Sequence, residues 1–419
     1  MIFQTPSISL EDHRVLEEIH AMRTELAEHL RVPRRWSGGL RRHALAQAIR
    51  GSNSIEGYVV EVDDAAAAVD DEEPLSADEQ TFVEIRGYRQ TLGYVLAMAA
   101  DEHFVLDASA IRSMHFMLLG HDLAKSPGRY RTGPIYVRDE ATDVEVYEGP
   151  EAELVPSLVD ELVDSLTDAT DDALVQAAMA HLNLVMIHPF RDGNGRLARA
   201  LQTLVLARRG MADPTFSSIE EWLGANTADY YRVLAHTGAG AWHPDREAAL
   251  WVSFNLRAHH MQAQTLQHRI AQAMAMWTAI DSVSADHGLP DRAGLALYEA
   301  ALGYRVRRAT YLKRAEVEER TGSRDLKQLV EAELLRPVGA TKGRYYVPGP
   351  ALEGVQDARR AARRPIRDPY PWLPARLAQP TPVEQIKPLS PPLDTVSSEG
   401  RRDGRTGLVR DGAMGELGS

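Results

Sequence analysis

The sequence of 419 residues contains no cysteine. This absence excludes thiol nucleophiles, disulfide bonds and cysteine-ligated zinc, and it fits a reducing compartment. The sequence also has no run of about 18 apolar residues, so we expect no membrane-spanning helix. The N-terminus lacks the basic and apolar regions of a signal peptide. These absences together predict a cytoplasmic protein.

The remaining composition is that of a globular protein. Hydrophobic residues make up 44% and charged residues 26% of the chain, and the length predicts two or three domains. The formal net charge is −13, which argues against nucleic-acid binding by the protein as a whole. A local basic module is still compatible with this charge.

Most of the first 350 residues show apolar side chains at three- and four-residue spacing, which predicts helices. The clearest segments are residues 15–30, 44–49, 81–99, 154–166, 174–187, 197–206 and 251–276. A β-hairpin is predicted at residues 135–147, around a polar turn. We therefore expect a mainly α fold. The acidic residues 63–64 and 70–73 are expected to form a solvated loop rather than a metal site.

The character of the chain changes near residue 280. Residues 303–350 carry eleven Lys and Arg but only six Asp and Glu. The sequence here predicts a helix, a turn at residues 321–323, a second helix at 325–335 and a glycine-containing β-wing. This order of elements is typical of a winged-helix-like module. Residues 351–419 are rich in proline, glycine, serine and scattered charges, so we expect a disordered tail.

Residues 188–199, HPFRDGNGRLAR, lie between two helical patterns. Pro189 ends the preceding helix. Gly193 and Gly195 permit backbone conformations that other residues resist, and Asn194 stands at the start of the next helix. A glycine-containing loop that opens a helix offers free backbone N–H groups and the positive end of the helix dipole. The segment therefore predicts a phosphate-binding loop.

The side chains of this segment suit phosphate chemistry. Arg196 and Arg199 share one face near the helix N-terminus, where cations are unfavourable unless an anion lies between them. Asp192 offers the hard oxygen that Mg²⁺ prefers. His188 has the pKa range of a general base. Together they predict transfer of a phosphorus-containing group.

A second motif, Ser52-Asn53-Ser54-Ile55-Glu56-Gly57, follows the helical pattern at residues 44–49. Ser52 and Glu56 share a helix face, and Gly57 suits a helix C-terminus. A carboxylate at that end opposes the helix dipole. We therefore expect Glu56 to have a partner elsewhere in the fold.

Residues 188–199 resemble the signature of the Fic family, H-P-F-x-D/E-G-N-G-R-x-x-R, at every specified position. The resemblance implies a helical core that transfers AMP from Mg·ATP to a Ser, Thr or Tyr hydroxyl of a target protein. It implies that His188 is the base and that Asp192 holds Mg²⁺. It also implies that Gly193, Asn194 and Gly195 bind the α- and β-phosphates, and that Arg196 and Arg199 grip the phosphates.

The same family resemblance extends to three other segments. The motif at Ser52, Glu56 and Gly57 is similar to the family's inhibitory motif, whose glutamate pairs with the second arginine of the signature, here Arg199. The hairpin at 135–147 looks like the flap on which a target peptide docks. Tyr230 and Tyr231 lie in a segment similar to the border of the adenine site.

We therefore predict an N-terminal helical region with the inhibitory motif (1–100), a Fic catalytic core with its following helix (101–280), a winged-helix-like module (281–350) and a tail (351–419). Removal of AMP and transfer from another nucleotide are alternatives within the family. A different alternative is a nucleotide-sensing transcription regulator that binds DNA through residues 281–350. A homodimer is left open, and no membrane partner is expected.

Overall fold

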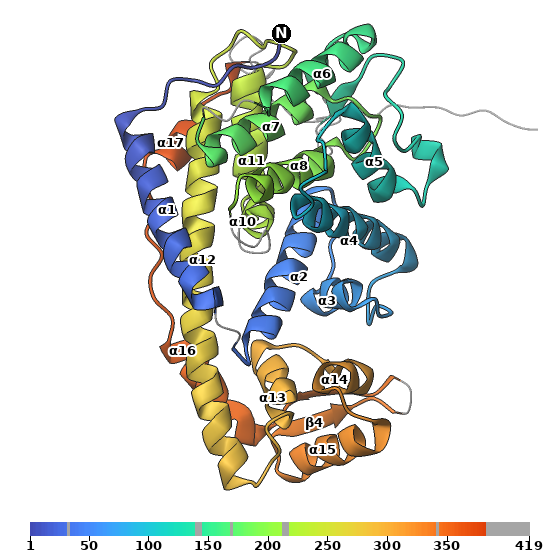
Figure 1. Cartoon of the computed structure of the whole chain (residues 1–419), viewed down its shortest axis with the longest axis vertical. Coiled ribbons are helices and arrows are strands. Elements are labelled where there is room, and N and C mark those ends of the chain that lie inside the picture. Colours follow the sequence, from blue (N-terminus) through green and yellow to red (C-terminus); the bar gives the residue numbers. More distant parts are fainter. Residues whose placement is uncertain (32–33, 139–144, 168–170, 212–217, 341–342, 383–419) are drawn as a thin grey trace, which may run out of the picture.

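The computed structural model describes residues 1–31, 34–138, 145–167, 171–211, 218–340 and 343–382. It confirms the predicted mainly helical fold (Figure 1). The helices are α1 (Leu10–Arg31), α2 (Ser37–Ile55), α3 (Val62–Asp70), α4 (Glu79–Ala99), α5 (Ala108–Leu119), α6 (Val155–Ser165), α7 (Ala173–Ile187), α8 (Asn194–Arg208), α10 (Glu220–Ala225), α11 (Thr227–Gly238), α12 (Ala249–Asp286), α13 (Ala293–Leu302), α14 (Arg308–Ala315), α15 (Glu319–Glu331), α16 (Glu353–Ala361) and α17 (Leu373–Leu377). The strands are β1 (Tyr136–Arg138), β2 (Glu145–Glu148), β3 (Val306–Arg307), β4 (Leu335–Val338) and β5 (Tyr345–Pro348). Short 3₁₀ turns, η1 (Leu123–Lys125), η2 (Ala152–Leu154) and η4 (Pro350–Leu352), join some of them.

Helices α7 and α8 form the centre of the larger hydrophobic core. Both are buried along almost their whole length, as expected for helices that are surrounded by others on every side. The indole N–H of Trp251 on α12 donates to the carbonyl of Ala178 at 2.8 Å. The loop between α7 and α8, residues 188–193, is therefore held by two helices of the buried core.

Helix α12 connects the two hydrophobic cores. Its 38 residues extend about 57 Å at 1.5 Å per residue, and it runs beside both the upper and the lower parts of the molecule in Figure 1. Trp251 and Phe254 lie in the larger core, whereas Ile270 and Trp277 lie in the smaller one. The domain boundary that we expect at residue 280 falls inside this helix.

The smaller core is formed by the predicted winged-helix-like module together with parts of α1, α2, α12 and α16. Helices α13, α14 and α15 pack beside a three-stranded antiparallel sheet with strand order β3-β5-β4. The turn predicted at residues 321–323 is wrong, because these residues lie inside α15. Gly322 is buried there, and a Cβ on it would lie 2.2 Å from Leu312 Cδ2. Glycine at this position thus permits close packing of α15 on α14.

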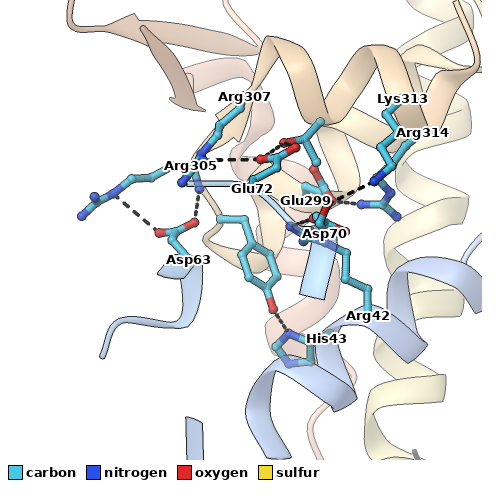
Figure 2. A network of polar contacts seen from close by, with 12 residues as sticks. Arg42, His43, Asp63, Asp70, Glu72, Glu299, Arg305, Arg307, Lys313 and Arg314 are labelled. Carbon is cyan, nitrogen blue, oxygen red and sulfur yellow. Dashed lines mark hydrogen bonds and ion pairs between the residues drawn. The ribbon is translucent and has the colours of Figure 1, made fainter. Parts of the chain in front are cut away.

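The module docks on α2 and α3 through ion pairs (Figure 2). Asp63 forms an ion pair with Arg305, and Glu72 forms one with Arg307. Arg42 of α2 lies 2.6 Å from Asp70 of α3 and 3.2 Å from Glu299 of α13. The prediction of a solvated acidic loop is therefore wrong. Charges that look repulsive along the sequence are neutralised by arginines from other elements, and Arg305 and Arg307 lie more than 200 residues away from their carboxylate partners.

The predicted disorder of the segment that begins at residue 351 is wrong as far as residue 382. Helix α16 packs along α12, and Tyr370, Leu373 and Leu377 are buried in the larger core. The Tyr370 hydroxyl donates to Asp12 at 2.6 Å. A few well-placed apolar side chains outweigh the proline-rich composition. Residues 383–419 lie outside the described residues, as do residues 139–144 of the hairpin and 341–342 of the wing.

Within the described ranges, no helix is long and apolar enough to cross a bilayer.

Candidate active site

The loop between α7 and α8 has an unusual backbone at both ends. His188 ends α7 with φ of 50°, and Gly193 precedes α8 with φ of 76°. Asn194 closes the loop, because its side-chain amide donates to the carbonyl of Phe190 at 2.8 Å and accepts from the Phe190 N–H at 3.0 Å. No side chain caps α8. Its first N–H groups are therefore open to an anion.

Two residues outside the motif hold this loop in place. Arg131 Nε donates to the carbonyl of His188 at 2.9 Å. His115 stacks on Phe190 with ring centroids 3.7 Å apart, and its Nε2 donates to the carbonyl of Asp192 at 2.9 Å. Because both lie more than 55 positions away from the loop, no local spacing points to them.

His188 has a defined hydrogen-bonding pattern. Its Nδ1 lies 3.1 Å from the carbonyl of Val185, which can only accept, so Nδ1 carries the proton and Nε2 is left as an acceptor. Burial, with a smaller effect of the Arg131 charge, lowers the pKa of His188 below its ordinary value. The imidazole is therefore neutral near pH 7 and able to take a proton.

Asp192 and Arg196 belong to one chain of alternating charges. Lys125 Nζ lies 2.9 Å from Asp192 and 2.7 Å from Glu84 on α4, and Glu84 lies 2.7 Å from Arg196. Burial alone would raise the pKa of Glu84, but the hydrogen bonds from Lys125 and Arg196 lower it to about 2. Lys125 likewise lowers the pKa of Asp192 against the effect of burial. Sequence spacing gave no sign of Glu84 or Lys125.

Arg199 meets the predicted inhibitory motif. Its Nη2 lies 2.6 Å from Glu56 and 2.9 Å from the carbonyl of Ser52, and its Nε donates to the Ser52 hydroxyl at 2.7 Å. Burial would lower the pKa of Arg199, but the charge of Glu56 raises it. The structure thus brings together Ser52, Glu56 and Arg199, which are distant in sequence.

Glu56 lies directly over the start of α8. A Cβ on Gly195 would lie 2.4 Å from Glu56 Oε1, so only glycine lets the carboxylate come this close. Gly57 follows with φ of 82°, a conformation that favours glycine. The carboxylate therefore lies against the backbone of the first turn of α8, beside Arg199.

The site is built for an anion in other ways too. Arg199 Nη1 and Arg196 Nε are buried and have no hydrogen-bond partner in the part of the chain that the structure describes. Unpaired buried guanidinium N–H groups are costly. A phosphate group would satisfy them, together with the N–H groups of α8.

The described part of the hairpin lies beside His188. The Tyr147 hydroxyl of β2 donates to the carbonyl of Met186 at 2.7 Å, and Gly149 approaches the side chain of His188. The expectation that Tyr230 lines a base pocket is not supported, because it is 1% exposed in the core and bonds His181. Tyr231 is 47% exposed, and its hydroxyl donates to Ile55 beside Glu56.

Comparison with known proteins agrees with this geometry. A model of the Fic/DOC family matches residues 105–206. "Protein adenylyltransferase fic-1" of Caenorhabditis briggsae is 28% identical over 248 residues, which cover 57% of this chain and 45% of the relative. "Protein adenylyltransferase Fic" of Nematostella vectensis is 27% identical over 244 residues, which cover 56% and 53%. The chain thus spans about half the length of the curated relatives it matches.

A solved structure shows the same fold. The crystal structure of a Fic family protein from Desulfovibrio desulfuricans G20 superposes with a TM-score of 0.53 at 24% identity, and the match covers 83% of this chain and 99% of that chain.

Proposed function

On the premise that residues 105–206 form a Fic/DOC family domain, we propose that this protein transfers AMP from ATP to a hydroxyl of a target protein. One observation carries the proposal: a neutral histidine, an uncapped helix N-terminus and an arginine with an unpartnered N–H meet at one loop. These are the parts that phosphoryl-group transfer requires.

The reaction follows from the positions of these groups. His188 Nε2 removes the proton from the target hydroxyl, and the hydroxyl oxygen forms a bond to the α-phosphorus. The bond from that phosphorus to the bridging oxygen breaks, and pyrophosphate leaves. The N–H groups at Gly193, Asn194 and Gly195 stabilise the negative charge on the phosphates, and Arg199 binds the distal phosphate. The hairpin predicted at 135–147, of which the structure describes β1 and β2, would align the target peptide.

Asp192 is the residue that would hold Mg²⁺. Its carboxylate is 39% exposed, and one or two carboxylates plus substrate phosphates are a usual coordination for this ion. When bound, the ion would neutralise charge on the phosphates. Lys125 faces the same carboxylate and would have to move aside or share it.

Glu56 acts as a brake in this proposal. It neutralises Arg199 and covers Gly195, so it competes with the phosphates for both. The competition is a population shift, in which ATP binds productively only in molecules whose Glu56 has moved away.

Self-modification tests the activity and the brake together. Wild type, Glu56→Gly, and Glu56→Gly with His188→Ala are incubated with Mg²⁺ and ATP labelled on the α-phosphate, and label on protein is followed by gel and intact mass. We expect Glu56→Gly to incorporate label at least about tenfold faster than wild type, which corresponds to about 1.4 kcal/mol. The variant that also lacks His188 should incorporate none.

Glu61→Gly is the matched control. Glu61 is exposed at the start of α3, so its loss removes the same charge without touching Arg199. Equal stimulation by both substitutions would refute the brake. If the protein is labelled only by another nucleotide, that nucleotide is the donor and ATP is not. If no nucleotide labels it, AMP removal or nucleotide sensing becomes the better interpretation.

DNA binding by residues 281–350 gains no support from the docking of the module. Arg305, Arg307 and Arg314 contribute to its positive charge but face carboxylates inside the molecule (Figure 2). DNA binding therefore stays a prediction from the sequence, as does a homodimer.

A further inference from the structure

Lys125 binds two carboxylates at once beside the candidate active site. Its ammonium lies 2.9 Å from Asp192 Oδ2 and 2.7 Å from Glu84 Oε1. The other oxygen of Asp192, Oδ1, accepts a hydrogen bond from the N–H of Gly193 at 2.6 Å. In the part of the chain that the structure describes, both oxygens of Asp192 are therefore engaged, one by the backbone and one by a lysine.

The fold fixes the spacing between Lys125 and Asp192. Lys125 ends the short turn η1, and Ser126 after it turns the chain with φ of 55°. The N–H of Gly128, three residues after Lys125, donates to His115 Nδ1 at 2.8 Å. The Nε2 of the same ring donates to the carbonyl of Asp192 at 2.9 Å. One imidazole therefore connects the segment that carries Lys125 to the backbone of Asp192, so the ion pair is held in place from both sides.

Glu84 is the second partner of the ammonium. Its side chain is 5% exposed, and its Oε2 lies 2.7 Å from Arg196, which leaves Oε1 for Lys125 and for His121 at 3.2 Å. A lysine ammonium has three donors on a flexible stem. Lys125 can therefore release Asp192 and still keep a carboxylate partner in Glu84.

A metal ion and Lys125 exclude each other on Asp192. Mg²⁺ coordinates carboxylate oxygens at about 2.0–2.1 Å. An ammonium that stayed 2.9 Å from Oδ2 would then lie within about 5 Å of the ion. The two like charges repel each other strongly where protein partly excludes water, and the side chain of Lys125 is only 24% exposed. Binding of the ion therefore requires Lys125 to leave Asp192.

We propose that Lys125 is an exchangeable counter-ion for Asp192. It neutralises this carboxylate in the absence of metal, and it withdraws to Glu84 when Mg²⁺ binds. The proposal rests on the proposed function, because it takes Asp192 as the residue that holds the ion. Lys125 acts through Asp192, so it sets the affinity for the metal: Lys125 lowers this affinity, and Glu84 raises it by holding Lys125 away.

Titration of the full chain with Mn²⁺, without nucleotide, tests the exchange. Mn²⁺ prefers the same oxygen ligands as Mg²⁺, and electron paramagnetic resonance measures the free ion. We expect Lys125→Met to tighten Mn²⁺ binding at least about tenfold, because the competing charge is gone. Lys125→Arg keeps the charge and should not tighten it.

Lys327→Met is the matched control for the loss of one positive charge. Lys327 is 76% exposed and lies 3.4 Å from Glu331 on its own helix, so its removal leaves Asp192 and Lys125 untouched. Its affinity for Mn²⁺ should equal that of wild type. Equal tightening by Lys125→Met and Lys327→Met would overturn the exchange.

Glu84→Gln distinguishes an exchange from a general effect of charge. In wild type this substitution leaves Lys125 to Asp192 alone, so we expect Mn²⁺ binding to weaken at least about threefold. In the Lys125→Met background there is no ammonium to hold, and the same substitution should change the affinity less than about twofold. Additive effects would overturn the exchange. If Glu84→Gln does not fold, because it leaves the buried Arg196 without its counter-charge, the contrast between Lys125→Met and Lys125→Arg still decides.

Asp192→Asn separates the exchange from the proposed function. If it abolishes Mn²⁺ binding while Lys125→Met leaves the affinity unchanged, the exchange is overturned and the metal assignment stands. If Mn²⁺ binds Asp192→Asn as tightly as wild type, the metal assignment fails, and the exchange fails with it. Absence of binding by both wild type and Lys125→Met up to about 10 mM Mn²⁺, roughly the weakest affinity worth a site, would also overturn the exchange.

Discussion

The protonation state of His188 is fixed by its surroundings. Nδ1 is engaged by the carbonyl of Val185, and burial lowers the pKa of the ring below 6.5. A base with a lowered pKa stays neutral as the pH falls to 6.5 and loses activity only when the pH passes through the lowered value. We therefore expect the rate of the Glu56→Gly variant to fall at acid pH with a midpoint below pH 6.5. Label incorporation measured between about pH 5 and 8, roughly the range in which histidine titrates, tests this.

The assay should saturate ATP, so that the profile reports the bound enzyme. A midpoint at or above pH 6.5 would show that His188 is not the titrating base or is not buried during the reaction.

The backbone of helix α2 packs very close to α10 beside the site. A Cβ on Gly51 would lie 2.3 Å from the carbonyl oxygen of Glu220, and Gly51 directly precedes Ser52 and lies five residues before Glu56. Gly51→Ala must therefore push α2 away from α10. We expect a loss of about 1–3 kcal/mol in the free energy of unfolding, as for other overpacked sites, measured by urea denaturation.

Gly38→Ala is the control on the same helix, because a Cβ there meets nothing within 4 Å. It should leave stability unchanged or raise it by about 0.5–1 kcal/mol through helix propensity. Equal destabilisation by both substitutions would contradict the claim that glycine is required at position 51 for the close contact between α2 and α10.

The sequence predicts elements best where local pattern and tertiary packing agree. The apolar spacing at residues 174–187 and 197–206 identified α7 and α8, and the motif between them predicts the roles of His188 and Arg199. Glu84 and Lys125 escaped prediction because they meet Arg196 and Asp192 only through the fold. Composition also failed between residues 351 and 382, where a few apolar side chains decide the packing and the average does not.

At the scale of the whole molecule, the module is joined to the rest by charges that no single segment reveals. The side chain of Glu299 on α13 is 7% exposed and forms ion pairs with both Arg42 of α2 and Arg314 of α14 (Figure 2). Arg42 in turn binds Asp70 of α3. One buried carboxylate therefore connects elements from both hydrophobic cores.

Neutralising this carboxylate should weaken the whole assembly. Glu299→Gln leaves two largely buried guanidinium groups near each other without their shared counter-charge, and we expect about 3 kcal/mol loss in the free energy of unfolding. Glu331→Gln is the control, since Glu331 is 62% exposed and, among the described residues, pairs only with Lys327 on its own helix. That pair should contribute less than about 0.5 kcal/mol. Urea denaturation followed by tryptophan fluorescence measures both, and equal changes would show that the ion pairs at Glu299 do not hold the module in place.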